Sequence, residues 1–332
     1  SYGVREYGDR TDAEAAFASA EHTVDIEIIN NRLAPTAMEP RGCNIAWDGE
    51  TLTVYQGCQS VHVLRDRLAN SMRLDSKDIH FISPDVGGAF GLKFFLQCET
   101  VVAAHAAMAT GRPVKWMADR NESFLSDLHG RDHVTRGAMA LDAEGKITAM
   151  RVTIRANLGA YCSQAGPMIP WFGACMTTGC YDVGIAYVDV EMVVTNTVPV
   201  DAYRGAGRPE AAYLVERLMD KAAMQLGISP IEIRRRNFIR PEQFPYRTPT
   251  GRAYDSGEYT RLMDAALERA DWDGFEGRRA ESAARGRLRG IGMSYYVEIC
   301  SAMGGENTYV RFEPDGRVTV LMGTQASGQG HE

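Results

Sequence analysis

Apolar and polar residues alternate along many short stretches of the chain, as they do in strands with one buried face. This pattern, or a short run rich in β-branched residues, predicts strands over 23–29, 51–55, 79–83, 113–118 and 187–195. The stretches 134–141 and 147–156 flank the turn sequence Asp142-Ala143-Glu144-Gly145 and predict a hairpin. A second hairpin is expected over 308–313 and 317–322, across Pro314-Asp315-Gly316.

Other stretches have the spacing of apolar residues that is typical of helices. The expected helices are 12–21, 99–110, 209–226 and 258–270, together with one that begins after Ser229. Within 209–226 the apolar positions are Ala212, Leu214, Val215, Leu218, Ala222 and Met224. Ser229 is the expected N-cap of the next helix, with Pro230 in its first turn and Glu232 completing a capping box.

The order of these elements predicts a mixed α/β fold of the α+β type, arranged in a long first part and a shorter last part. Residues 1–257 form the expected first domain, which ends in an irregular connection rich in Pro, Gly, Thr and Arg. A helical connection follows over 258–289, and its second half is charged and expected to be exposed. A new β unit starts near Gly290, so 290–332 is interpreted as the incomplete beginning of a second domain.

Composition and charge narrow the class of protein. The chain has 332 residues and a net charge of −7, which argues against a nucleic-acid-binding protein with a basic patch. No apolar run approaches the roughly 18 residues that a membrane-spanning helix needs. Seven cysteines occur without a C-x-x-C pair, so neither a zinc ribbon nor an iron–sulfur cluster is expected within this chain. Reduced thiols in a cytoplasmic protein are the expected state.

Three glycine-rich loops stand out as candidate binding sites. They are Gly87-Gly88-Ala89-Phe90-Gly91-Leu92-Lys93, Ala202-Tyr203-Arg204-Gly205-Ala206-Gly207-Arg208, and Gly323-Thr324-Gln325-Ala326-Ser327-Gly328-Gln329-Gly330. Glycines allow backbone N–H groups to approach a bulky ligand, and a loop that leads into a helix aims such donors at negative charge. The guanidinium groups of Arg204 and Arg208 would favour an anion nearby.

The loops alone leave two interpretations open, an anionic cofactor site and ordinary structural turns. None of the loops is a P-loop, and 87–93 lacks the G-x-G-x-x-G spacing of a dinucleotide site. An unrelated enzyme that uses NAD or ATP is therefore not indicated.

The motifs resemble one family of enzymes. Residues 87–93, Ala-Tyr-Arg-Gly-Ala-Gly-Arg-Pro-Glu at 202–210 and Gly-Gln-Gly-His-Glu at 328–332 are similar to cofactor loops of the xanthine dehydrogenase, aldehyde oxidase and aerobic carbon monoxide dehydrogenase family. Met38-Glu39-Pro40-Arg41 and Arg235-Arg236-Asn237-Phe238-Ile239 are also typical of it, and all occur in the family's order. The resemblance implies the molybdenum-binding large subunit of such an enzyme, with two molybdenum-cofactor-binding domains in place of the two parts described above.

The family resemblance also implies a cofactor and partners. These enzymes hold molybdenum on molybdopterin, usually as the cytosine dinucleotide form in bacteria, and hydroxylate a carbon with oxygen derived from water. Electrons leave through a [2Fe–2S] subunit and a FAD subunit, so a heteromer or a dimer of heteromers is expected. A small-molecule substrate is implied, and neither a nucleic acid nor a membrane is an expected partner.

Roles transfer residue by residue from the resemblance. Gln59 lies where the family places a glutamine beside the metal's oxo ligand, and Arg204 lies where some members stabilise charge on the substrate. The expected cofactor-binding residues are Gln59, Gly87, Gly88, Ala89, Phe90, Gly91, Arg204, Gly205, Ala206, Gly207, Gly328, Gln329, Gly330 and His331. Phe90, Phe94 and Tyr203 are expected to line the substrate pocket. No residue is expected to coordinate the metal directly.

Departures from the family pattern reduce the range of expected substrates. Gly205 stands where carbon monoxide dehydrogenase has a copper-bearing cysteine, which argues against carbon monoxide. Phe94 stands where purine-oxidising members have a glutamate, which argues against xanthine and favours an aldehyde or a less polar N-heterocycle.

The catalytic glutamate of the family would lie beyond Glu332, which belongs to the third loop and is not assigned as the base. The chain is therefore expected to be a truncated product or one part of a split subunit, joined by the remaining part of the molybdenum subunit and inactive alone. The alternative is a non-catalytic module that folds and associates but holds no metal.

Overall fold

We describe residues 2–298 and 307–331 of a computed structural model of the chain. Two predicted features, Cys300 and Glu332, lie outside the described residues. The chain forms two compact units, each built from separate segments. The first unit contains 1–32, 131–196 and 205–298, and the second contains 33–130, 197–204 and 299–332. Each unit is described by itself.

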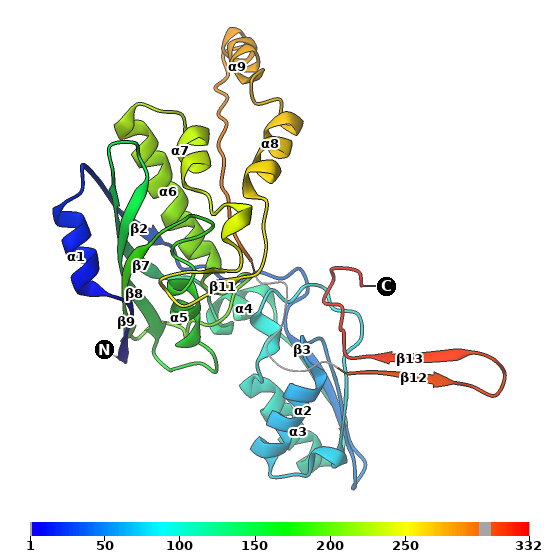
Figure 1. Cartoon of the computed structure of the whole chain (residues 1–332). Helices are drawn as coiled ribbons and strands as arrows, with labels where there is room; N and C mark the ends of the chain where they lie inside the picture. Colours follow the sequence, from blue (N-terminus) through cyan, green and yellow to red (C-terminus); the bar gives the residue numbers. More distant parts are fainter. Residues whose placement is uncertain (1, 299–306, 332) are drawn as a thin grey trace. The chain divides into compact units, whose positions relative to one another are not determined.

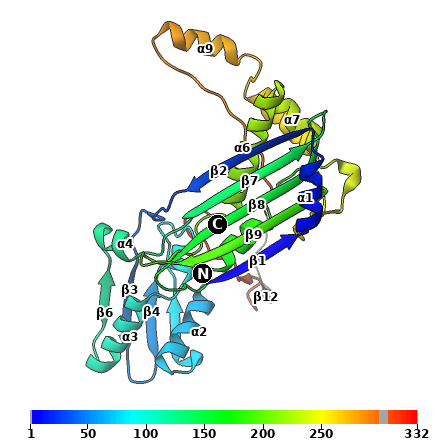
Figure 2. The same cartoon turned by 90° about the vertical axis from the view of Figure 1, so that its left-hand side faces the viewer.

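The first unit contains a five-stranded sheet with the order β1-β9-β8-β7-β2 (Figure 2). Its strands are β1 (Gly3–Gly8), β2 (His22–Asn30), β7 (His133–Leu141), β8 (Ile147–Gly159) and β9 (Ile185–Val194). All neighbours are antiparallel except β8 and β9, which run parallel. The hairpin predicted around 142–145 is confirmed as β7 and β8.

Helices cover both faces of this sheet (Figure 1). The long helix α6 (Arg208–Leu226) and the short α5 (Met168–Ala174) pack on one face, and α1 (Arg10–Ala18) lies on the other. The buried side of α6 includes Leu214, Val215, Leu218 and Ala222, as its apolar spacing predicts. Met224 is exposed instead, because it lies off the buried stripe of the helix.

The helix α7 (Pro230–Asn237) begins at the predicted cap, where Ser229 accepts a hydrogen bond from the N–H of Glu232. Glu232 itself pairs with Arg236 at 2.7 Å. The prediction that Glu232 completes a capping box therefore differs from the structure, since a neighbouring guanidinium one turn on offers the carboxylate a stronger partner.

A buried charge network joins α6, α7 and the connection beyond them. The guanidinium of Arg234 is fully buried and contacts the carboxylates of Glu216 and Asp220, both at 2.9 Å. Glu216 also accepts a hydrogen bond of 2.8 Å from the N–H of Tyr295. Burial raises the pKa of Glu216, and the attraction of Arg234 opposes this shift. These contacts fix the segment before residue 298 on the first unit.

The remaining elements of the first unit are η3 (Pro241–Gln243), β10 (Tyr246–Arg247), β11 (Ala253–Tyr254), α8 (Tyr259–Arg269) and α9 (Phe275–Ala284). The irregular connection predicted over 240–257 thus contains one short turn and one small ladder. The stretch 278–289 is mostly exposed, as expected, and its first part belongs to α9, within the helical connection predicted over 258–289.

The second unit contains a four-stranded sheet with the order β5-β4-β3-β6. The strands are β3 (Gly42–Trp47), β4 (Leu52–Gln56), β5 (Ile79–Ile82) and β6 (Val114–Met117). Two helices, α2 (Val61–Met72) and α3 (Cys98–Thr110), pack against it, and α4 (Arg120–Ser126), η1 (Ser76–Asp78) and η2 (Leu92–Phe94) complete its turns (Figure 1). Its core is formed by aliphatic residues such as Ile45, Leu64 and Ala104.

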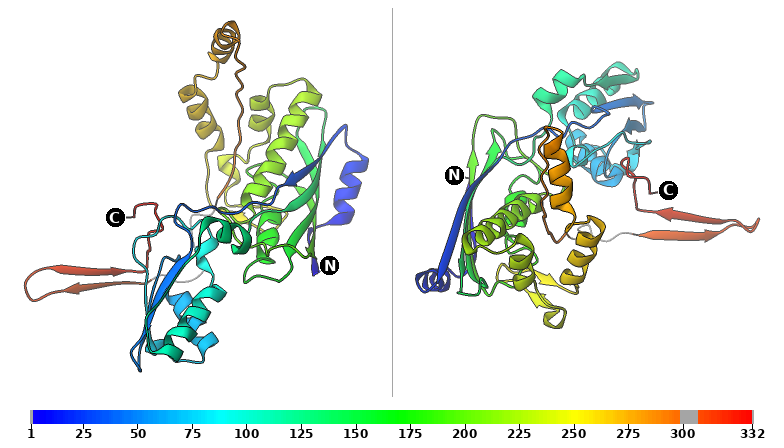
Figure 3. Two further views of the ribbon diagram at one scale, coloured as in Figure 1. Left: turned by 180° about the vertical axis from the view of Figure 1, so that it is seen from behind. Right: turned by 90° about the horizontal axis from the view of Figure 1, so that it is seen from above.

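The predicted hairpin near the C-terminus is confirmed as β12 (Thr308–Phe312) and β13 (Val318–Met322), which form a two-stranded sheet of their own (Figure 3). Apolar residues on both of its faces are exposed, among them Tyr309, Val310, Phe312 and Val320.

The predicted mixed α/β fold is confirmed. Elements that the patterns did not predict are β1, β3, β10, β11, α2, α4 and α5, together with the short turns η1, η2 and η3. No helix among the described residues is long and apolar enough to cross a membrane. The cysteines in this part of the chain are free thiols, and Cys43, Cys58, Cys175 and Cys180 are buried.

Candidate cofactor-binding site

The first glycine-rich loop, residues 87–93, lies in the second unit with an unusual backbone. Phe90 has a φ of 55°, in the left-handed region that non-glycine residues rarely adopt, between Gly88 at 96° and Gly91 at 102°. A Cβ on Gly91 would lie 2.3 Å from the carbonyl oxygen of Ala202. Glycine is therefore required at this position, because the loop touches the chain just before Tyr203.

Gln59 supports this loop from the end of β4. Its Oε1 accepts a hydrogen bond of 2.9 Å from the N–H of Gly91, and its own N–H donates to the carbonyl of Lys93 at 3.1 Å. Because the partner of Oε1 is a donor, the orientation of the side-chain amide is determined. The Nε2 group of Gln59 is thereby left as the donor that can face a ligand.

The first half of the second loop, residues 202–204, also belongs to the second unit. The N–H of Arg204 donates to the carbonyl of Phe90 at 3.1 Å. The side chain of Tyr203 packs so closely on Gly130 that a Cβ there would lie 2.4 Å from the Cβ of Tyr203. The structure therefore brings Arg204 and Tyr203 to the first loop.

The third loop reaches the same place. A Cβ on Gly328 would lie 3.1 Å from the carbonyl of Val86 and 3.5 Å from the N–H of Gly88. Gln325 holds this loop, because its Nε2 donates to the carbonyl of Cys58 at 2.6 Å and to Ser83 Oγ at 2.8 Å.

The rest of the third loop is more open. Within it, Gln329 Oε1 accepts from the N–H of Ser327 at 2.5 Å, so this side chain closes its own turn. Gly330 and His331 are exposed, and a Cβ on Gly330 would meet nothing within 4 Å.

The second half of the second loop, Gly205-Ala206-Gly207, lies in the first unit. All three residues have positive φ angles, 88°, 45° and 95°. A Cβ on Gly207 would lie 2.3 Å from the carbonyl of Ile169 and 2.7 Å from the N atom of Gly173. This turn is therefore held by close contact between backbones, which only glycine permits.

Arg208, which follows this turn, already has partners. Its Nε lies 2.8 Å from Glu298, and its Nη1 donates to the carbonyl of Gly205 at 3.2 Å. The carboxylate of Glu298 offsets the positive charge of Arg208, which the sequence analysis expected to attract an anion. Arg208 therefore acts here on the turn and on the connection near residue 298.

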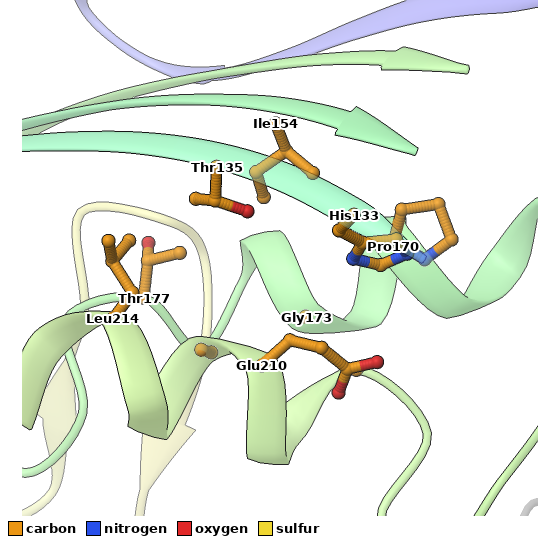
Figure 4. A pocket seen from close by; sticks show the side chains of 10 residues that line it. His133, Thr135, Ile154, Pro170, Gly173, Thr177, Glu210 and Leu214 are labelled. Carbon is orange, nitrogen blue, oxygen red and sulfur yellow. The ribbon is translucent and has the colours of Figure 1, made fainter. Parts of the chain in front are cut away.

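A small cavity lies beneath Gly207 in the first unit, and Figure 4 shows the side chains around it. Its polar lining residues are His133, Thr135, Thr177 and Glu210, and its volume is about 10 Å³. Glu210 pairs with Arg131 at 3.1 Å, and burial lowers the pKa of His133. A space of this size holds at most about one water molecule, so it is not the cofactor pocket.

The residues of the second unit fit an anionic, oxygen-rich group. Within the described residues, no acceptor pairs with the N–H groups of Gly88, Ala89 and Phe90. Unpaired backbone donors in a glycine cradle suit oxo and phosphate oxygens. The same part of the chain contains no group of three or more His, Cys, Asp or Glu side chains that could hold a metal ion.

Two partly exposed aromatic side chains, Phe90 and Phe94, lie in or directly after the first loop. Phe90 and Phe94 are 39% and 37% exposed, and Phe94 packs edge to face on Phe95 at 5.3 Å. Exposed rings beside unpaired donors give the site an apolar side and a polar side.

Sequence reasoning missed Glu39, Lys93 and Gln325 as site residues, although all three hold the loops in place. Glu39 lies in the Met38-Glu39-Pro40-Arg41 motif and Lys93 closes the first loop, so the motifs contained the signal. No sequence pattern showed that these side chains point at backbone groups.

Comparison with known proteins identifies the family of the chain. The molybdopterin cofactor-binding domain family matches residues 3–238, and a second domain of the same description matches 265–332. The carbon monoxide dehydrogenase large chain of Hydrogenophaga pseudoflava is 35% identical over 98% of this chain and 43% of its own. The nicotine 6-hydroxylase large subunit of Paenarthrobacter nicotinovorans is 33% identical over 99% of this chain and 42% of its own.

Solved structures agree as well. Quinoline 2-oxidoreductase from Pseudomonas putida 86 superposes with a TM-score of 0.89 at 29% identity, over 99% of this chain and 44% of that one. The fold and the loops define a molybdopterin-binding protein. The chain belongs to the large-subunit family of the molybdenum hydroxylases, and it spans less than half the length of these relatives.

Proposed function

We propose that the chain is a catalytic-core segment of a molybdenum hydroxylase that oxidises an aldehyde or an N-heterocycle. One observation carries the proposal: Gln59, the first loop, Arg204 and the third loop meet within the second unit. These groups are contributed by distant parts of the sequence, and their polar atoms are those that an oxo and phosphate-bearing cofactor needs.

The molybdenum–molybdopterin cofactor, in the cytosine dinucleotide form, would supply the two-electron redox chemistry and the transferable oxygen. Gln59 Nε2 would donate to the metal's oxygen ligand, and the N–H groups of residues 88–90 would line the same side. The glycine turn at 205–207 and residues 328–331 would hold the pterin and phosphate. Arg204 would stabilise negative charge that develops on the substrate.

The apolar wall of Phe90, Phe94 and Tyr203 supports a substrate without many polar groups. Carbon monoxide is a poor candidate, because the family's copper-bearing cysteine is replaced by Gly205. A Cβ at this position would also lie 2.6 Å from the ring of Pro209, and the φ of 88° disfavours any side chain. The names of the nicotine and quinoline relatives support an N-heterocycle as the first class to test.

The electron acceptors would be partner subunits. We propose a cytoplasmic heteromer, or a dimer of such heteromers, with the remaining part of the molybdenum subunit, a [2Fe–2S] subunit and a FAD subunit. Residues 1–257 and 290–332 would belong to two cofactor-binding domains, joined by 258–289. The apolar faces of β12 and β13, which are exposed here, suit burial against the remaining part of the molybdenum subunit.

The test is the substitution Arg204→Ala in the partner-containing complex, with Arg136→Ala as a control at an exposed ion pair. We expect turnover of N-heterocycles and aldehydes, followed with a dye acceptor, to fall by a factor of about 100 or more. Molybdenum content should stay near one atom per copy. An equal loss of both would assign Arg204 to cofactor binding alone, and a wild-type complex without molybdenum would favour a non-catalytic module.

A further inference from the structure

An ion pair between a buried lysine and a partly exposed glutamate supports the first loop. The side chain of Lys93 is 2% exposed, and its Nζ lies 2.5 Å from Glu39 Oε2. The side chain of Glu39 is 39% exposed. A lysine ammonium is rarely buried to this extent without a carboxylate, because its loss of hydration is costly. The position of Lys93 therefore depends on Glu39.

Glu39 also holds the other end of the same loop. Its Oε2 accepts a hydrogen bond of 3.0 Å from the N–H of Gly87, and its own N–H donates to the carbonyl of Gly87 at 3.1 Å. A single carboxylate oxygen thus receives both the first N–H and the last side chain of the loop. A movement of Gly87 away from Lys93 would stretch or break at least one of these two contacts of Glu39 Oε2.

The glycines that surround the Glu39 side chain leave little space for larger residues. A Cβ on Gly87 would lie 2.5 Å from the Cβ of Glu39, and a Cβ on Gly57 would lie 3.1 Å from Glu39 Oε2. The carboxylate therefore lies between the loop and the end of β4, with one side open to solvent. Between the two ends that Glu39 joins lie the unpaired N–H groups of residues 88–90.

We propose that Glu39 and Lys93 are positioning residues that hold the first loop in its cofactor-binding conformation. The inference rests on the proposed function, because it concerns the same site. Neither residue would contact the substrate. The pair acts by fixing the distance between Gly87 and Lys93, and with it the direction of the donors between them.

The experiment measures backbone hydrogen exchange of the partner-containing complex prepared without molybdenum, in the wild type and in Glu39→Gln. The peptide over 84–94 should exchange about tenfold faster in the variant, because local opening becomes easier when the charge is lost. Glu27→Gln, the same change at an exposed ion pair with Arg136, should leave this peptide unaltered. Lys93→Met serves as a second variant, should Glu39→Gln fold poorly.

The second readout is molybdenum content after loading, which should fall several-fold in Glu39→Gln while the Glu27→Gln control keeps its metal. Unchanged exchange over 84–94 in both Glu39→Gln and Lys93→Met would overturn the proposal and leave the pair as a packing contact. Faster exchange combined with a wild type that binds no molybdenum would instead reject the proposed function and keep the positioning role.

Discussion

The two glycine-rich turns at 87–93 and 205–207 are held in different ways. The turn in the second unit is fixed by polar side chains that reach it from elsewhere in the chain, namely Glu39 and Gln59. The turn in the first unit is fixed by backbone against backbone, with Gly207 in contact with Ile169 and Gly173. The first turn depends mainly on hydrogen bonds and charge, although Gly91 also makes a close backbone contact with Ala202. The second turn depends mainly on the absence of side chains, and Arg208 adds one hydrogen bond to Gly205.

This difference indicates which amino-acid substitutions each turn can tolerate. Side-chain hydrogen bonds weaken gradually, since a shortened or neutralised partner still leaves room for adjustment. A backbone contact leaves no such room, because a clash can be relieved only by moving an element. We therefore expect polar substitutions to loosen the first turn and small apolar substitutions to break the second.

The largest effect is expected from Gly207→Ala. The new Cβ would meet two backbone atoms at a positive φ, so the free energy of unfolding should fall by about 3 kcal/mol or more. Gly88→Ala should cost only about 1–2 kcal/mol, because its nearest neighbour is the movable ring of Phe90. Thermal unfolding measures both, with Gly184→Ala as a control in open space. Equal losses at 207 and 88 would remove the contrast.

A smaller effect is expected from Arg208→Met. Its ion pair with Glu298 is partly exposed to water, so the loss should be about 1 kcal/mol. Chemical denaturation compares this variant with Gly207→Ala. If Arg208→Met were as damaging as Gly207→Ala, the second turn would also depend on side chains, and the comparison would fail.

The smallest effect is expected in the pH dependence of the unfolding free energy. Burial keeps the pKa of His133, beside the cavity under Gly207, below its ordinary value of 6.5, so the folded state favours the neutral ring. The stability that this contributes is present above pH 6.5 and is lost as the pH falls toward the lowered pKa. Between about pH 7.5 and pH 5.5 the unfolding free energy should drop by on the order of 1 kcal/mol more in the wild type than in His133→Asn. Parallel pH profiles of the two proteins would contradict this.

Periodicity predicted much of the fold, and the reasons for its failures are physical. The hairpins and α6 were predictable because their buried faces follow a regular spacing. The helix α2 was not, because its apolar stripe is weak and Arg65 lies within it. The strand β1 was not predictable either, since it is an edge strand whose partner β9 lies far along the sequence.

The candidate site was predictable as a set of loops but not as a set of contacts. Resemblance placed Gln59 and the glycines, and the structure brings Gln59 to Gly91. The roles of Glu39 and Gln325 come from bonds to backbone atoms, which no residue pattern records. The division of the second loop between two units, after Arg204, is also a property of the packed chain alone.

The hydrogen bond from Gln325 to the carbonyl of Cys58 has a consequence for how the protein matures. The two residues are 267 positions apart, so this part of the cradle closes only after the segment around Gln325 has left the ribosome. A large cofactor could thus be loaded into the complete cradle only after the third loop has been synthesised. Until then the nascent chain would hold its first loop without the support of Gln325.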